Sequence, residues 1–351
     1  MTAQTSQTAT APLFHLAGTG AALPGPPVDN TVMDEVFHLS EEWIDAFVGT
    51  RTRHFGWDPV TGAATHSLAD LCAEAAVRAL DAAGLEPAEL DFLVLTTATP
   101  DTLLPTTATA VADRLGLNHL PAYQLQGGCA GAVQALDVAR ALLAGGHRIG
   151  LVVGGDVTAR FLDAGRDVAG LSSQELVNYV LFGDGAGAAV VSAEPLGEGV
   201  AVRSLLNRFT GLGRPAGQIV DWHGAARPDP DRLMMFEDYK AIEAQVPALA
   251  GEILWELLES TGWRAEELDF LLPPQLSGRM TQRIVEGLYA PAAREVSCVA
   301  ETGNTGNALP LLQLDRLLPE MTPGAKAVSV VVESSKWIKA GLTLEKPRED
   351  Q

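Results

Sequence analysis

The stretch LDAAGLEPAELDFL at residues 80–93 returns later in the chain as LESTGWRAEELDFL at residues 258–271. Each copy is typical of a helix end, a glycine C-cap, an acidic turn and a buried strand, in that order. An internal repeat of this kind limits the folds that the chain can adopt. Because the chain holds only two copies, the repeat predicts a duplicated α/β unit rather than a solenoid.

A second matched element follows each copy. The first half carries GCAG at residues 128–131, the second half carries GNTG at residues 303–306, and an apolar helical pattern comes after both. Packing the two halves together is expected to bring Cys129 and Asn304 to equivalent helix N-termini. The alternation of strands with helices predicts mixed α/β layers, with strands at residues 92–97, 149–153, 186–192 and 327–332.

Cys129 is the strongest candidate for a catalytic residue. It stands in the string GGCAGA at residues 127–132, between an expected strand and an expected helix. At a helix N-terminus, free backbone N–H groups and the helix dipole favour thiolate over thiol. Neighbouring glycines let a substrate carbonyl approach closely, so the pattern indicates a cysteine that accepts acyl groups. A small buried thiol in a tight turn is the alternative, and the glycines on both sides favour the nucleophile.

Composition and charge exclude several classes of function. The chain has 351 residues, 47% of them hydrophobic, which suits a well-packed α/β protein. Its formal net charge of −20 argues against a nucleic-acid partner. No apolar run is long enough to span a membrane, and the N-terminus does not resemble a signal peptide. Three cysteines without a C-x-x-C pair support neither disulfides nor a metal site, so a cytoplasmic location is expected.

The domain prediction follows from the repeat. Residues 1–11 are expected to be a disordered lead, residues 12–195 the half with the nucleophilic cysteine, and residues 196–347 the second half. The glycine strings do not indicate a nucleotide cofactor. GTG at residues 18–20 lacks the third glycine of the dinucleotide fingerprint, and GDGAG at residues 183–187 leads into an expected strand rather than a helix.

Several strings together resemble those of a known family. Besides the cysteine turn they are EWI at 42–44, GTRTRH at 49–54, GDVTAR at 155–160, FGDGAGA at 182–188, PPQ at 273–275 and GNT at 303–305. Over nearly its whole length the chain is similar to the β-ketoacyl-ACP synthase III group of the thiolase superfamily. The resemblance implies a five-layered αβαβα fold, a homodimer, and a tunnel for the phosphopantetheine arm of CoA or an acyl carrier protein. In the family, cysteine takes an acyl group from a thioester, and a His/Asn pair then decarboxylates a malonyl thioester for condensation.

The resemblance also implies how the acyl donor would bind. Trp43 matches a position that stacks on the adenine of CoA, with core packing as the alternative, and Arg160 and Arg279 match positions that contact CoA. The forked donors of arginine suit phosphate at such positions. Phe47 stands where the family has another entrance arginine. No permanently bound cofactor is expected, because an acyl-CoA or phosphopantetheine thioester is the substrate and a small molecule is the acceptor.

The sequence departs from the family at one decisive position. Where the family has Pro-His-Gln-Ala-Asn, this chain has PPQLS at residues 273–277, so Pro274 replaces the histidine while Cys129 and Asn304 remain. The family's glycine-rich turn near the C-terminus is altered to ESS at residues 333–335. Losing one donor to a developing oxyanion typically costs about a hundredfold or more in rate. We therefore expect these changes to slow decarboxylation more than acylation of the cysteine.

Three functions stay open on the sequence. The first is an acyltransferase that passes the acyl group of Cys129 to an O, N or S acceptor, with Asn304 as a second catalytic residue, in polyketide or other specialised metabolism. The second is a decarboxylative condensing enzyme in which His223, Glu301 or the substrate replaces the histidine. The third is a non-catalytic partner subunit of a heterodimeric synthase, which the retained cysteine turn disfavours. We favour the acyltransferase.

Overall fold

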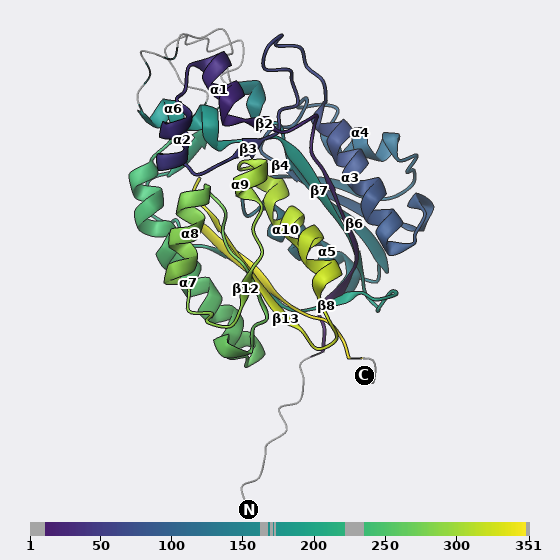
Figure 1. The fold of residues 1–351 in the computed structure, drawn as a ribbon. Coiled ribbons are helices and arrows are strands. Elements are labelled where there is room, and N and C mark those ends of the chain that lie inside the picture. Colours follow the sequence, from purple (N-terminus) through teal and green to yellow (C-terminus); the bar gives the residue numbers. More distant parts are fainter. Residues whose placement is uncertain (1–10, 162–167, 169–170, 172, 222–234, 349–351) are drawn as a thin grey trace, which may run out of the picture.

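Strands from both ends of the chain meet in one continuous sheet (Figure 1). The computed structural model describes residues 11–161, 168, 171, 173–221 and 235–348. Within these residues the sheet has ten strands. In spatial order they are β12 (Arg294–Glu295), β11 (Phe270–Leu272), β13 (Lys326–Glu333), β14 (Ile338–Glu345), β8 (Val200–Phe209), β1 (Phe14–Ala22), β7 (Gly185–Ser192), β6 (Ile149–Asp156), β4 (Phe92–Thr97) and β5 (Ala122–Gln126).

The strand order is symmetric about the centre of the sheet. From β1 outward it runs β1-β7-β6-β4-β5, and from β8 outward it runs β8-β14-β13-β11-β12. The directions match as well, because β6–β7 and β13–β14 are antiparallel whereas β4–β6 and β11–β13 are parallel. β1 and β8 join the halves by an antiparallel pairing of Phe14 with Val202 and of Leu16 with Val200. The predicted duplication of an α/β unit is therefore confirmed.

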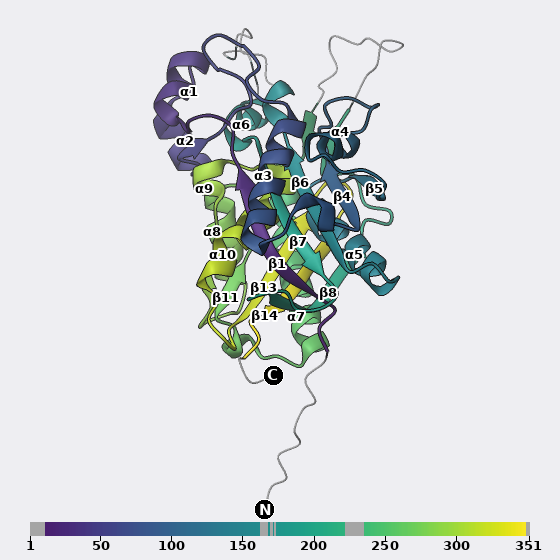
Figure 2. The same ribbon diagram turned by 90° about the vertical axis from the view of Figure 1, so that its right-hand side faces the viewer.

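Helices separate and cover the two halves of the sheet (Figures 1 and 2). They are α3 (Leu68–Ala83), α4 (Thr107–Arg114), α5 (Gly131–Ala144), α7 (Tyr239–Thr261), α8 (Gly278–Gly287) and α10 (Leu309–Leu317). α5 and α10 lie between the halves and share one buried apolar cluster with strands of both. α3 and α4 cover one outer face, and α7 and α8 cover the other. These are the five αβαβα layers that the sequence predicts.

The repeated sequence forms the same local structure twice. α3 ends at Gly84 and α7 at Gly262, with φ of 67° and 69°, a conformation that glycine adopts without strain. In the acidic turn that follows, the carboxylates of Glu89 and Glu267 each accept a hydrogen bond of 2.8 Å from the backbone N–H three residues earlier. The four strands expected from the sequence are present as β4, β6, β7 and β13.

Shorter elements form a cap at one end of the molecule (Figure 1). Figure 1 labels α1 (Asn30–Phe37), α2 (Glu41–Phe47), α6 (Ser173–Leu181), α9 (Val299–Thr302), β2 (Val28–Asp29) and β3 (Thr52–Arg53) in this part. The short strands β9 (Gln218–Val220) and β10 (Met235–Glu237) pair with each other, and Met235 of β10 belongs to the apolar cluster of the cap. Arg53 is fully buried there and donates to Asn30 Oδ1 at 2.7 Å and to the Val180 carbonyl at 3.2 Å. Burial lowers the pKa of Arg53 to about 10. The string around Arg53 therefore holds the cap together.

The boundary between the halves falls in the segment after β7. β7 ends at Ser192 and β8 begins at Val200. The domain boundary at residue 195 stays a prediction, and residues 1–10 of the expected lead lie outside the described residues. In the part of the chain that is described, no helix is both long and apolar enough to cross a membrane.

Candidate active site

Cys129 lies in the turn that leads from β5 into α5. α5 begins at Gly131, whose N–H donates to the Gly128 carbonyl at 2.8 Å. A Cβ atom on Gly131 would lie 2.0 Å from Asn307 Oδ1 and 2.3 Å from Thr96 Oγ1. Only glycine fits at this position, because the second half of the molecule approaches the cysteine turn so closely.

A buried hydrogen-bond network fixes the two halves against each other at this point. Asp156 accepts from Thr97 Oγ1 at 3.0 Å, and from the backbone and side-chain nitrogens of Asn307 at 2.8 and 2.9 Å. Asn307 also donates to the Gly127 carbonyl at 2.8 Å and accepts from Thr96 Oγ1 at 2.8 Å. Burial raises the pKa of Asp156, and the hydrogen bonds from Asn307 offset part of that rise. The turn that carries Cys129 is therefore held by the turn that carries Asn304.

Asn304 is positioned by the glycine-rich string before β7. Its N–H donates to the Leu181 carbonyl at 2.8 Å, and its carbonyl accepts from Gly183 at 3.2 Å. A Cβ atom on Gly183 would lie 2.1 Å from the Thr302 carbonyl, so the string packs directly against the second-half turn. The Asn304 side chain accepts from Gly306 N–H at 3.0 Å and is nearly buried.

Cys129 and Asn304 line one cavity of about 550 Å³, a size in the range of small-molecule sites. Apolar walls come from α2, α6, α7 and α8, and polar side chains from β9, β10 and the start of α7. Trp43 lies in the wall beside Phe47, with ring centroids 5.8 Å apart, and Phe47 is 68% exposed. The cavity thus connects the cysteine to an aromatic rim and suits an acyl chain or a pantetheine arm.

The expectation that the helix N-terminus favours a thiolate at Cys129 is wrong. Burial raises the pKa of the thiol well above its usual value, and the carboxylates of Glu333, Asp156 and Glu237 raise it further. The Ala130 N–H, which would favour a thiolate, instead donates to Glu333 Oε2 at 3.0 Å. These surroundings therefore favour the neutral thiol of Cys129 over the thiolate.

Sequence reasoning missed two buried carboxyl groups beside the cysteine. Glu333 is 3% exposed, and a Cβ atom on Gly128 would lie 2.2 Å from its Oε1. Glu237 lines the cavity with Cys129 and is 5% exposed. Burial raises the pKa of both groups, that of Glu237 to about 7. Both residues end a strand, and only the folded chain shows that Met235 and Glu237 are buried while Phe236 is exposed.

Pro274 lies close to the cysteine. Both residues line a small pocket, together with Val330, Val331 and Val332, and this pocket shares Cys129 and Val332 with the lining of the larger cavity. Proline has no side-chain proton to donate, so this wall offers no hydrogen bond to a substrate oxygen from that side chain. That Pro274 takes the place of the family's histidine stays a prediction.

The residue after Pro274 anchors this segment. Gln275 Oε1 accepts from the backbone N–H groups of Cys298 and Val299 at 2.5 and 2.7 Å, at the start of α9. The PPQ string is therefore fixed to the turn that leads to Asn304. Cys298 and Cys72 are fully buried, as expected of packing residues.

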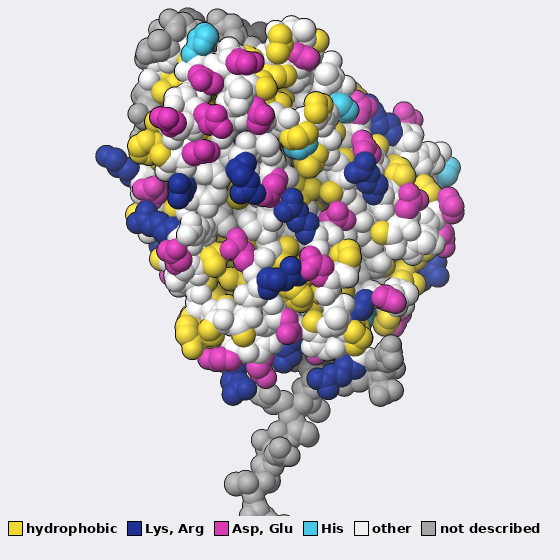
Figure 3. Space-filling model, viewed as in Figure 1, with side chains coloured by type: hydrophobic (Ala, Val, Ile, Leu, Met, Phe, Trp, Pro, Cys, Tyr) yellow, Lys and Arg dark blue, Asp and Glu magenta, His cyan; other side chains and the backbone are white. Residues whose placement is uncertain are grey.

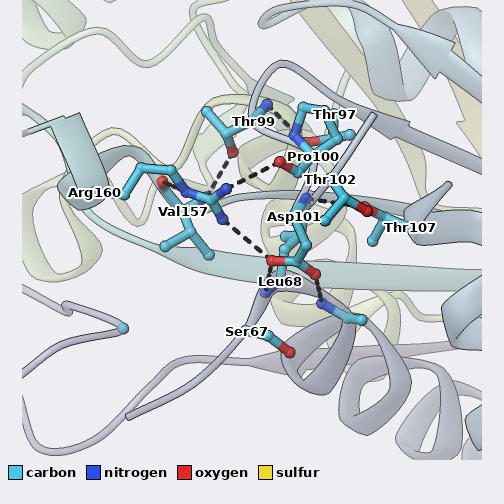
Figure 4. Close-up of polar contacts among 12 residues, drawn as sticks. Ser67, Leu68, Thr97, Thr99, Pro100, Asp101, Thr102, Thr107, Val157 and Arg160 are labelled. Atoms are coloured by element: carbon cyan, nitrogen blue, oxygen red, sulfur yellow. Dashed lines mark hydrogen bonds and ion pairs between the residues drawn. The ribbon is translucent and has the colours of Figure 1, made fainter. Parts of the chain in front are cut away.

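Arg160 does not line the cavity. Its guanidinium donates to the carbonyls of Val157 and Pro100 at 3.1 and 2.9 Å and to Asp101 Oδ1 at 3.2 Å (Figure 4). Asp101 in turn accepts from the first N–H groups of α3, including that of Leu68 at 2.9 Å. Arg160 thus stabilises the loop after β4 and the start of α3, and its contact with CoA stays a prediction.

Arg279 lies at the exposed edge of α8, next to the end of α2. Its guanidinium donates to the Asp45 carbonyl at 3.2 and 3.0 Å, and its N–H donates to the Val48 carbonyl at 3.1 Å. Val48 and its neighbour Phe47 line the cavity. Arg279 is therefore near the rim that Trp43 and Phe47 form, and its role in binding the donor is also untested.

Glu301 and His223 are the two residues that the sequence offers as substitutes for the histidine. Glu301 pairs with Arg51 and with Arg316, its side chain is 43% exposed, and it does not line the cavity. His223 lies outside the described residues. Among the residues that the structure describes, no group of three or more His, Cys, Asp or Glu side chains is placed to hold a metal ion.

Comparison with known proteins places the chain in a family. The family model for 3-oxoacyl-[acyl-carrier-protein (ACP)] synthase III matches residues 123–205, and the model for its C-terminal part matches residues 258–333. A β-ketoacyl-[acyl-carrier-protein] synthase III of Streptomyces coelicolor is 35% identical over 309 residues, covering 86% of this chain and 87% of its own. A relative from Sphingopyxis alaskensis with the same name is 34% identical over 301 residues, covering 86% and 88%. The chain belongs to the β-ketoacyl-ACP synthase III family.

Solved structures agree with this assignment and add a more specific likeness. AbyA1, described as a tetronic acid condensing enzyme, is 54% identical, with a TM-score of 0.92 over 95% of this chain and 99% of its own. The synthase III of Pseudomonas aeruginosa PAO1 is 28% identical, with a TM-score of 0.80 over 95% and 98%. The priming β-ketosynthase of the R1128 polyketide pathway is 26% identical, with a TM-score of 0.79 over 98% and 99%.

Proposed function

We propose that this protein is an acyltransferase that builds a tetronic-acid-type ring. It takes a β-oxoacyl group from a carrier-protein or CoA thioester onto Cys129 and passes it to the hydroxyl group of a hydroxyacyl thioester. The observation that carries the proposal is a cysteine that lines both a 550 Å³ cavity and a small neighbouring pocket, and in the small pocket Pro274 offers no side-chain proton. The 54% identity to a tetronic acid condensing enzyme supports the choice of product.

The chemistry of the ring fits a site without the histidine. A tetronic acid contains one ester bond, from a hydroxyl to an acyl carbonyl, and one carbon–carbon bond to a second former thioester. The carbon that forms this second bond lies between two carbonyl groups of the β-oxoacyl unit, so it loses a proton readily. No carboxylate has to be expelled to make it a nucleophile. The donor that decarboxylation of a malonyl thioester needs is therefore dispensable here.

The steps follow from the placement of the residues. Cys129 Sγ attacks the donor carbonyl, the carbon–sulfur bond to the donor breaks, and the donor thiol leaves with the cysteine proton. The acceptor hydroxyl then attacks the acyl-cysteine, and Cys129 regains a proton. In the last step the carbon between the two carbonyls attacks the acceptor's own thioester and releases the second thiol. The Asn304 amide lies on the same cavity and would donate to a substrate carbonyl oxygen.

The surface offers a place for an anionic donor. Figure 3 shows acidic side chains over α1 and α2, and a band of basic side chains that crosses the face over α8 and α9. Arg279, beside the cavity rim, is one of the exposed arginines of α8. A phosphopantetheine arm that enters past Trp43 would place its phosphate near such groups. We therefore propose a carrier protein or CoA thioester as the donor. We also propose that the protein is a homodimer in the cytoplasm.

Mass spectrometry of the intact protein tests the proposal. We expect incubation with a β-oxoacyl thioester to add one acyl group, which is absent in Cys129→Ala, and a hydroxyacyl thioester to discharge it into a ring product. If malonyl thioester releases carbon dioxide rapidly and yields a β-ketoacyl product, the protein is a decarboxylative condensing enzyme instead. If Cys129 takes no acyl group from any donor, the non-catalytic subunit is the better account.

A further inference from the structure

Glu237 is a buried carboxyl group on the wall of the catalytic cavity. It ends β10, directly before Asp238, which caps the N-terminus of α7. Its side chain lines the same cavity as Cys129 and Asn304, and the residue is only 5% exposed. A carboxylate in such a place is costly unless it is well paired. Its hydrogen-bond partners therefore indicate whether the carboxyl group stabilises the fold or interacts with the substrate.

The carboxyl group is only partly paired. Gln218 Nε2, on the neighbouring strand β9, donates to Glu237 Oε1. Oε2 is buried and receives no hydrogen bond from any described residue. The Tyr239 hydroxyl lies beside it but donates its one proton to Asn178 Oδ1 at 2.6 Å. One oxygen of Glu237 is thus left without a donor, in a buried residue that lines the cavity.

We propose that Glu237 is the general base that takes the proton from the acceptor hydroxyl as this hydroxyl attacks the acyl group on Cys129. The inference rests on the proposed function, since it assigns a residue to the acceptor step. If the carboxyl group turns toward the cavity, a hydroxyl group of the acceptor would supply the hydrogen bond that Oε2 lacks. The geometry also separates this role from that of the cysteine, because Glu237 comes from the β9–β10 hairpin and Cys129 from the turn before α5.

The step balances without any further reactant. The hydroxyl oxygen forms a bond to the acyl carbon, its proton passes to the Glu237 carboxylate, and the bond between that carbon and Cys129 Sγ breaks. The sulfur leaves as a thiolate in a buried site that raises the pKa of its thiol. It therefore takes the proton back from Glu237, which returns both groups to their starting states.

The electrostatic surroundings suit a base that works near neutral pH. Burial raises the pKa of Glu237 to about 7, and the nearby Tyr239 hydroxyl and the hydrogen bond from Gln218 offset part of that rise. Among the described residues, the other titratable side chains that line this cavity are those of Cys129, Tyr239, Lys240 and Glu243. A base with a pKa near the working pH combines a large ionised fraction with a useful affinity for the proton.

The test separates the two half-reactions in Glu237→Gln. The acyl-enzyme is formed first and its amount is measured by intact mass, and a hydroxyacyl thioester or hydroxylamine is then added. We expect the acyl-enzyme still to form, and its discharge to the hydroxyl to slow by about a hundredfold or more. Discharge to hydroxylamine, which needs no base, should be unchanged. The wild-type discharge rate should rise with pH around 7, and the variant should lose this dependence.

Matched variants show whether a lower rate in Glu237→Gln comes from damage to the structure. Glu259→Gln removes the same charge from an exposed position of α7 and should discharge like the wild type, whereas Glu237→Asp should recover part of the lost rate. If Glu237→Gln discharges to the hydroxyl at the wild-type rate, or if discharge to hydroxylamine falls equally, the assignment of the base is overturned while the proposed function stands. If the wild-type acyl-enzyme does not transfer to any hydroxyl, the proposed function fails, and this inference with it.

Discussion

The network at Asn307 allows the coupling between the two halves to be tested by one substitution. Asn307→Ala removes three side-chain hydrogen bonds, to the Gly127 carbonyl, to Asp156 Oδ2 and from Thr96 Oγ1, with lengths of 2.8, 2.9 and 2.8 Å. The last two are fully buried, because Asn307 and Thr96 are 0% and Asp156 2% exposed, whereas the first is part-buried. Water therefore cannot replace the lost partners without rearrangement of the turn.

The magnitude follows from the kind of each bond. A neutral hydrogen bond contributes about 1 kcal/mol, and a bond to a charged group about 1.5–3 kcal/mol. Two bonds of the first kind and one of the second predict that Asn307→Ala lowers the free energy of unfolding by about 4 kcal/mol. Thr96→Val removes only the bond from the threonine hydroxyl at nearly constant volume, and is expected to cost about 1 kcal/mol. Both changes displace the cysteine turn, so acylation of Cys129 should slow as well.

Urea denaturation at pH 7 measures the first effect, and the rate of acyl-adduct formation by intact mass measures the second. Asn118→Ala, at an exposed loop position, serves as the control and should change the free energy of unfolding by less than about 0.5 kcal/mol. A loss below about 1 kcal/mol for Asn307→Ala, with unchanged acylation, would refute the view that this network holds the site together.

Three further outcomes are expected. The pKa of Glu237 rises from 4.5 to about 7 on folding, so the wild type loses stability as pH climbs through that window. Glu237→Gln should then be more stable by up to about 3 kcal/mol at pH 8 and no different at pH 4, and denaturation curves that coincide at both pH values would contradict this. Gly128→Ala should push Glu333 away from the Ala130 N–H, costing about 1.5–3 kcal/mol and slowing acylation; wild-type kinetics would mean that the carboxyl group moves freely. Wild-type protein should release carbon dioxide from malonyl thioester about a hundredfold or more slowly than a histidine-bearing relative, and Pro274→His should raise that rate, as measured with labelled carboxylate.

The fold was predictable because local signals repeat in the same order in both halves. The glycines at 84 and 262 end helices in the left-handed conformation, and each acidic turn forms the hydrogen bond that its glutamate offers. Apolar strands of the right length follow, and two copies with matching order can pack only as two similar layers. These signals are short-range, so the sequence displays them directly.

The site was predictable only in part. Cys129 and Asn304 were found from matched glycine strings, and the structure brings them to one cavity. The raised pKa of the Cys129 thiol could not be predicted from the sequence. It depends in part on Glu333, which is 204 residues away in sequence and accepts the hydrogen bond of the Ala130 N–H. Glu237 resembles any surface glutamate until β9 and β10 pair and bury it. Long-range burial, rather than residue type, sets the chemistry of both groups.

The contacts of Arg160 were equally hard to predict from the sequence. Arg160 was expected from the resemblance to contact the donor, yet three acceptors of its own chain surround its guanidinium. A family string shows that a residue is kept, but the string does not distinguish a contact with substrate from a contact within the loop. Such a distinction requires the hydrogen-bond partners, which only the folded chain displays (Figure 4).

The measurement that tests the central claim most directly follows an oxygen atom. A hydroxyacyl thioester whose hydroxyl carries ¹⁸O is supplied with a β-oxoacyl thioester, and the product is weighed together with any carbon dioxide. The account predicts a ring product that retains the ¹⁸O and contains every carbon of both acyl units, formed through acylated Cys129. A product without the label, or one that has lost carbon dioxide, would contradict acyl transfer from the cysteine to oxygen.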